Sequence, residues 1–274
     1  MTNIMNLFSE NQLEQGKAIG TVNTYVGVLE KFQTWLTTRE KELSQISNKD
    51  VQLFIDYLEQ QQKDPSTIEK YFAAISVFAR FLGKSEITAD IQRKEKVKES
   101  EIPESLDEKE EKKILSEVEL DGNLRNIAIV YTLLYTGIRI SELCALDLVH
   151  VNLTEKRLSV INQKGEVDRT IPLSSEVSKH LNNYIDSLNN PNQEALFVSS
   201  VNKRISTRAV QYMLQKYNVN PHKLRHTFCQ KLINKGIDIH TVAQLAGHKD
   251  INVTKRYAGA VQTNLEDAID RAFS

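Results

Sequence analysis

The chain is 274 residues long, which is enough for about two domains. With 40% hydrophobic and 26% charged residues it has an ordinary globular composition, which excludes a disordered or collagen-like protein. No apolar run approaches the ~18 residues that a membrane span needs, and residues 1–10 lack the pattern of a secretion signal. We therefore expect a cytoplasmic protein with no membrane partner.

The net charge of −1 conceals an uneven distribution. Residues 1–98 contain 13 Lys+Arg and 13 Asp+Glu, residues 99–121 contain 3 and 10, and residues 122–274 contain 19 and 13. The acidic stretch has a structural explanation, because acidic residues favour the first turn of a helix. The basic C-terminal part permits binding to a polyanion.

The first ninety residues predict a helical domain. Apolar residues recur at three- and four-residue steps in helices that begin near Thr21, Ser47 and Asp64, and a weaker helix is expected around residues 4–15. We predict a four-helix domain over residues 1–90 and an interdomain linker over residues 91–103. Charge runs are usually just solvated, and phosphate contact is the alternative for the basic residues of this linker, which are Arg93, Lys94, Lys96 and Lys98.

Residues 104–274 predict a mixed α+β domain, so the whole chain is expected to be mainly α with a small antiparallel β-sheet. Capping-box spacing at residues 105–108 begins the first helix, and an apolar helix over residues 123–135 ends at Gly137. Two strands are expected at residues 157–161 and 169–173, joined by a turn at Lys164-Gly165. Further helical patterns occupy residues 174–188, 206–217, 223–235, 238–246, 250–257 and 262–273.

Two of the segments that offer reactive groups lie early in this second domain. Arg139 begins a helix just after Gly137, with Glu142 three residues later. Taken alone, this pattern is better explained by a helix stop followed by a local Arg–Glu pair. Lys164 lies in the β-turn, where a lysine is either simply solvated or a mobile proton donor.

Two more such segments follow in the C-terminal helices. His222 and Arg225 share one face at the start of a helix, and a guanidinium fork fits an anionic phosphate. His226 is four residues from His222, but no acidic or thiol ligand accompanies the pair, so zinc is not expected. His248 follows the glycine of Leu-Ala-Gly-His, and Tyr257, which taken alone would be a core residue, comes nine residues later.

We expect no cofactor and no metal. The cysteines, Cys144 and Cys229, lie in apolar helical patterns and are expected to be reduced packing residues. The chain has no Asp/Glu set at metal-nuclease spacing, no P-loop and no Gly-x-Ser-x-Gly elbow.

In their order and spacing these segments resemble the catalytic domain of the tyrosine recombinases, the phage-integrase family. The matching pieces within residues 122–260 are TGIRISEL, QKG, HKLRHTF, LAGH and TKRYAG. The N-terminal helices resemble the SAM-like core-binding domain of that family, so the likeness covers nearly the whole chain. Departures are Cys229, where the family often has a smaller residue, and Ala258-Gly259, which replace a common Thr-His.

The resemblance implies a site-specific DNA recombinase that needs neither ATP nor a metal. Tyr257 would attack a backbone phosphate and form a covalent 3′-phosphotyrosyl link. Arg139 and Arg225 would stabilise the charge of the transition state, and Lys164 would protonate the leaving 5′-oxygen as general acid.

The two histidines and the glutamate of the motifs would have supporting parts in this reaction. His222 and His248 would hydrogen-bond the phosphate or the nucleophile, with His222 as a candidate proton acceptor from Tyr257. Glu142 would orient its neighbours. Further DNA contacts are expected from Lys223, Lys255 and Arg256.

The expected partners are double-stranded DNA with paired inverted-repeat sites and further copies of this chain. A helix over residues 262–274 would dock onto a neighbouring protomer to build a tetramer, or would pack against its own domain. A topoisomerase-like enzyme and a non-catalytic architectural protein are the alternatives. The role stays open between integration or cointegrate resolution for a mobile element and chromosome dimer resolution, and a compact two-domain form favours resolution.

Overall fold

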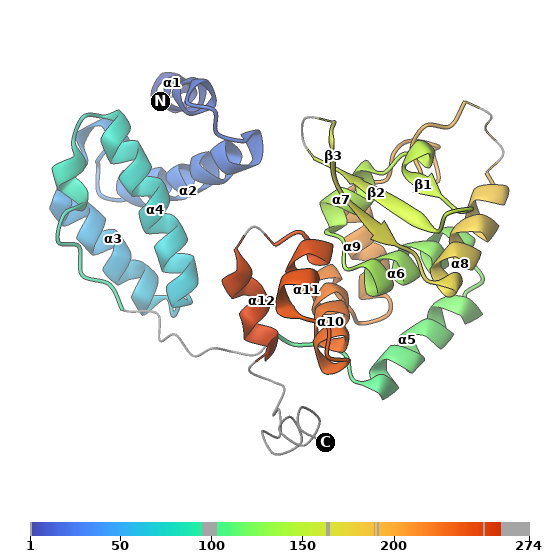
Figure 1. Ribbon diagram of the computed structural model, residues 1–274. Helices are drawn as coiled ribbons and strands as arrows, with labels where there is room; N and C mark the ends of the chain where they lie inside the picture. Colours follow the sequence, from blue (N-terminus) through green and yellow to red (C-terminus); the bar gives the residue numbers. More distant parts are fainter. Residues whose placement is uncertain are drawn as a thin grey trace, which may run out of the picture. The chain divides into compact units, whose positions relative to one another are not determined.

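The computed structural model describes residues 2–94, 103–162, 165–188, 190, 192–248 and 250–258. The chain is mainly helical with one small antiparallel sheet, as predicted (Figure 1). It divides into two compact units, Met1–Glu99 and Ser100–Ser274. Within the described part of the chain, no helix is long and apolar enough to cross a membrane.

The N-terminal unit is built from four α-helices and two short 3₁₀ helices, which are α1 (Thr2–Glu14), α2 (Ile19–Thr37), η1 (Leu43–Gln45), α3 (Asn48–Gln60), α4 (Pro65–Phe81) and η2 (Ser85–Thr88). The apolar faces predicted from the periodicity meet in one core, where the rings of Phe32, Trp35 and Phe54 pack together. Ser47 caps α3 as expected and forms a capping box with Asp50.

Residues 91–94, which the sequence assigned to the linker, are attached to this N-terminal unit. The backbone of Gln92 exchanges two hydrogen bonds with the side chain of Gln52 on α3, at 2.8 and 3.0 Å. Arg93 pairs with Glu69 at 2.7 Å and lies over the ring of Phe72 on α4. These contacts, which local sequence patterns do not reveal, fix the segment against α3 and α4.

The C-terminal unit contains the remaining elements, which are α5 (Glu108–Leu120), α6 (Leu124–Thr136), α7 (Ile140–Ala145), η3 (Leu148–His150), β1 (Val151–Asn152), β2 (Arg157–Ile161), β3 (Val167–Pro172), α8 (Ser175–Asp186), α9 (Thr207–Gln215), α10 (Pro221–Asn234), α11 (Ile239–Ala246) and α12 (Ile251–Ala258). Helix α6 is buried along most of its length, and α5, α8 and α10 pack around it. Cys144 and Cys229 are free and buried, as expected.

Three local details differ from the sequence prediction or sharpen it. The capping box of α5 is made by Asp107 and Glu110, two residues beyond the predicted start, because the Asp107 carboxylate accepts from the Glu110 backbone. A third strand, β1, extends the sheet in the order β1-β2-β3. Gly137 ends α6 in the left-handed region at φ 62°, which turns the chain directly into α7.

Candidate active site

Residues from α7, β2, β3, α10, α11 and α12, or from the turns at their ends, line a single cleft of about 1530 Å³ in the C-terminal unit. Five of the six predicted catalytic residues are among them, which are Arg139, His222, Arg225, His248 and Tyr257. The sixth, Lys164, lies outside the described residues. Helices α10 and α12 supply three of the five, His248 follows the end of α11, and these three helices pack side by side (Figure 1).

Arg139 is fixed by its position at the N-terminus of α7. Its backbone N–H donates to Oε2 of Glu142 at 2.7 Å, and its Nη1 donates to Oε1 of the same carboxylate at 2.8 Å. The local Arg–Glu pair that the sequence allowed is therefore present. Nη2 also donates to the backbone carbonyl of Gly247 at 2.6 Å, which connects Arg139 to the end of α11.

Arg225 of α10 is buried and has an incomplete set of partners. Its Nη1 donates to the backbone carbonyl of Gly137 at 2.5 Å, whereas Nη2 is buried without a hydrogen-bond partner among the described residues. Burial, followed by the nearby charge of Arg139, lowers the pKa of Arg225 to about 10, so the group is still cationic at neutral pH. A buried cationic donor without a partner favours an anionic ligand.

His248 follows Gly247, the left-handed cap of α11. Its Nδ1 lies 2.7 Å from Oγ1 of Thr254 on α12. Burial, with the charges of Arg225 and Arg139, lowers the pKa of His248 to about 4, so this imidazole is neutral at pH 7. A neutral imidazole has one donor and one acceptor nitrogen, and since Nδ1 is paired with Thr254, Nε2 is the nitrogen that a ligand would meet.

Tyr257 is fully buried near the end of α12. Its hydroxyl forms a hydrogen bond with Nδ1 of His226, and its ring lies parallel to that of His248. Burial raises the pKa of the phenol and lowers that of His226, so the pair is neutral at pH 7. The predicted partner of Tyr257, His222, is exposed on the preceding turn of α10. The one sequence signal for His226 is its four-residue spacing from His222. This spacing is typical of a metal site and does not indicate a contact with Tyr257.

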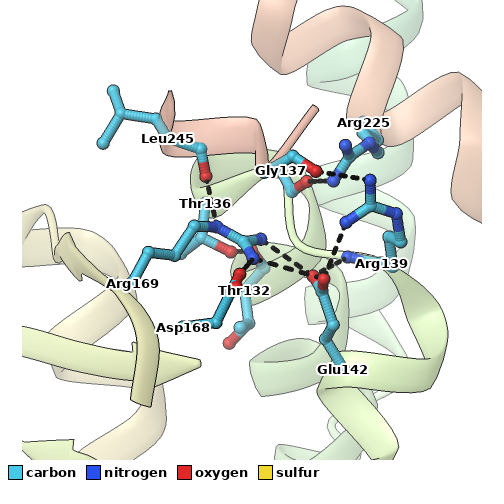
Figure 2. A network of polar contacts seen from close by, with 10 residues as sticks. Thr132, Thr136, Gly137, Arg139, Glu142, Asp168, Arg169, Arg225 and Leu245 are labelled. Carbon is cyan, nitrogen blue, oxygen red and sulfur yellow. Dashed lines mark hydrogen bonds and ion pairs between the residues drawn. The ribbon is translucent and has the colours of Figure 1, made fainter. Parts of the chain in front are cut away.

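A third arginine, Arg169 of β3, also lines the cleft and was missed by the sequence analysis. Figure 2 shows it beside the Glu142 carboxylate, which it shares with Arg139. Glu142 is largely buried, which by itself raises its pKa, but hydrogen bonds from Arg169 and Arg139 outweigh burial and leave the pKa below its ordinary value. The one sequence signal for Arg169 is its position two residues before the apolar Ile171, on the same face of the predicted strand.

The additional DNA-binding candidates lie at different places on the chain. Lys255 and Arg256 are exposed on α12, whereas the Lys223 ammonium is paired with Glu104 at 2.8 Å and Glu110 at 3.2 Å. Lys94 is largely exposed near Glu59. Lys96 and Lys98 lie outside the described residues, as does the predicted helix over residues 262–274. In the described ranges no group of three or more His, Cys, Asp or Glu side chains is placed to hold a metal ion.

Comparison with known sequences identifies the class of protein to which this fold and this cleft belong. Residues 104–263 match the phage integrase family, and residues 6–86 match the phage integrase N-terminal SAM-like domain. The chain therefore belongs to the phage integrase family of tyrosine recombinases.

Individual relatives agree with this assignment over almost the whole chain. Tyrosine recombinase XerA of Pyrococcus furiosus is 30% identical over 94% of this chain and 90% of its own length. The TnP I resolvase of Bacillus thuringiensis is 27% identical over 96% of this chain and 97% of its own length. The Tn1549 transposon integrase, solved with circular intermediate DNA, has the same fold with a TM-score of 0.73 at 19% identity, over 93% of this chain and 94% of that one.

Proposed function

We propose that this chain is a site-specific DNA recombinase that cuts and rejoins strands through a covalent 3′-phosphotyrosyl intermediate formed by Tyr257. The observation that carries the proposal is the buried Arg225 guanidinium with an unpartnered Nη2, in the same cleft as Arg139 and a buried tyrosine hydroxyl. Two guanidinium groups supply donors for the non-bridging oxygens of a phosphodiester. The Tyr257 phenol, which lines the same cleft, would supply the nucleophile for that phosphate.

The covalent step exchanges one phosphate ester for another. The Tyr257 hydroxyl gives its proton to a histidine of the cleft, His226 or His222, as its oxygen forms a bond to phosphorus. The bond from phosphorus to the 5′-oxygen breaks, and Lys164 donates a proton to that leaving oxygen. Attack by a partner 5′-hydroxyl on the phosphotyrosine reverses the exchange. Since one ester replaces another, no ATP is consumed.

In this proposal the histidines interact with the Tyr257 hydroxyl and with the phosphate. In the structure the Tyr257 hydroxyl is paired with His226, so the phenol must leave this partner or pass its proton to it before attack. Neutral His248 and the exposed His222, which both line the cleft, would hydrogen-bond the phosphate. Glu142 keeps Arg139 oriented through its carboxylate.

The test uses a DNA duplex selected by the purified protein from a randomised library and then nicked so that cleavage is irreversible. Wild-type protein should accumulate a covalent adduct, and Tyr257→Phe should bind the duplex without forming one. Tyr212→Phe is the matched control, because Tyr212 is 79% exposed on α9 and lies outside the cleft. An adduct with Tyr257→Phe would refute the nucleophile assignment.

The wider role of the protein is proposed from the same resemblance. The DNA partner would carry paired inverted repeats, and four protomers would assemble on two such sites through residues 262–274. The setting would be the cytoplasm of a bacterial cell, in association with the nucleoid. Deleting residues 262–274 should then weaken assembly on paired sites but preserve binding to a single site, whereas equal loss of both would favour packing of this segment on its own domain.

The biological task would be cointegrate or chromosome dimer resolution, or integration of a mobile element. A plasmid with two selected sites distinguishes these tasks from a topoisomerase-like activity. Recombinant product supports the recombinase. Relaxation of supercoils without exchange would instead indicate nicking and resealing of one strand.

A further inference from the structure

Arg169 occupies an unusual position for a charged side chain. It lies opposite Val160 in the β2–β3 pairing and, because side chains alternate along a strand, shares the inward face with the buried Ile171. Its side chain is only 7% exposed. A guanidinium buried this deeply must be compensated by charged or hydrogen-bonding partners.

Those partners come from two segments far from β3 in the sequence. Nη2 and Nη1 of Arg169 donate to the Glu142 carboxylate at 2.8 and 3.2 Å, which forms a bidentate pair. Nε donates to the backbone carbonyl of Leu245 at 2.8 Å, near the end of α11 (Figure 2). Nη1 also pairs with the neighbouring Asp168 at 3.0 Å. Four of the five guanidinium N–H donors are thereby occupied within the protein.

Both of these distant segments also hold Arg139. The Glu142 carboxylate accepts from Arg139, and so does the carbonyl of Gly247, two residues after Leu245. Arg169 lies directly against that glycine, because a Cβ on Gly247 would be 2.6 Å from Nη1 of Arg169. The Arg169 guanidinium therefore supports both described acceptors of the Arg139 side chain, which are the Glu142 carboxylate and the Gly247 carbonyl. It also supports the turn that carries His248.

We infer that Arg169 is a positioning residue for strand cleavage, which acts through Glu142 and the α11 turn rather than on the phosphate. This inference rests on the proposed function and adds a residue to its machinery. A lysine at position 169 keeps the charge but lacks the planar fork, so it cannot hold Glu142 at two points and Leu245 at the same time.

The experiment measures single-turnover formation of the covalent adduct on the nicked selected duplex. Arg169→Lys and Arg169→Met should slow adduct formation about 10- to 100-fold, as loss of a supporting contact typically does in metal sites. The dissociation constant for the same duplex should change less than about twofold, since Arg139 and Arg225 are still present. The control is Arg157→Met, which removes a 64% exposed arginine from β2 and should keep the wild-type rate.

A double-mutant cycle with Glu142→Gln separates positioning from general damage to the fold. If Arg169 acts through Glu142, the double variant should be no slower than the slower single variant, whereas independent effects multiply. If Arg169→Met does not fold, as judged by circular dichroism, Arg169→Lys supplies the cycle.

Three results would overturn the inference. They are a wild-type rate with Arg169→Lys, multiplicative losses in the cycle, or a loss of DNA affinity as large as the loss of rate. A wild-type protein that forms no Tyr257-dependent adduct would overturn the proposed function and this inference with it. An active wild type with an unaffected Arg169→Lys overturns the inference alone.

Discussion

Replacing Gly247 by alanine tests the contact between the α11 turn and the buried arginine. Gly247 has φ +68°, a conformation that costs an alanine about 1–2 kcal/mol. The new Cβ would lie 2.6 Å from Nη1 of Arg169, whereas ordinary contact begins at 3.4 Å. The guanidinium must therefore retreat and give up its bond to Leu245, and a hydrogen bond to a charged group contributes about 1.5–3 kcal/mol.

The chain contains a matched control for the backbone part of this cost. Gly122 has φ +66° beyond the end of α5, and a Cβ there would meet nothing within 4 Å. Gly247→Ala should therefore lower the free energy of unfolding by about 1.5–3 kcal/mol more than Gly122→Ala.

Urea unfolding followed by circular dichroism measures this difference. Fluorescence of Trp35, the single tryptophan, follows the N-terminal unit in the same samples. Equal losses for the two variants, within about 0.5 kcal/mol, would refute the packing of Arg169 against Gly247. A wild-type cleavage rate in Gly247→Ala would refute its link to Arg139.

Three further predictions follow from individual contacts. His226→Leu removes the partner of the buried Tyr257 hydroxyl, which costs about 1–3 kcal/mol. Amide hydrogen exchange in α12 should therefore accelerate about tenfold. Unchanged exchange would contradict the pairing. The pKa of His248 is lowered from 6.5 to about 4. Between these values the unfolded chain binds more protons than the folded protein. Stability should therefore fall as pH drops from 7 towards 4, and His248→Gln should flatten that fall in urea titrations. Lys255→Met should weaken binding to all duplexes alike and reduce the salt slope by about 1. An unchanged slope would remove this exposed lysine from the DNA-binding surface.

The sequence determined the elements whose signals are local. Apolar periodicity located α2, α3 and α4, and Gly137 marked the end of α6 because a left-handed residue terminates a helix wherever it folds. The order and spacing of the motifs predicted six catalytic residues, and five of these six line one cleft. Lys164 and the helix over residues 262–274 stay predictions, since neither lies among the described residues.

Contacts between side chains that are distant in the sequence depend on the tertiary structure alone. Arg169 and Leu245 are 76 residues apart, and His226 and Tyr257 are 31 apart, so no helical or strand period connects them. The two-residue strand β1 also has no local sequence signal, because it is defined by its pairing with β2. A side chain's local pattern fixes the face of the element that it occupies. Its partner is fixed by the packing of whole elements, which depends on the entire buried surface.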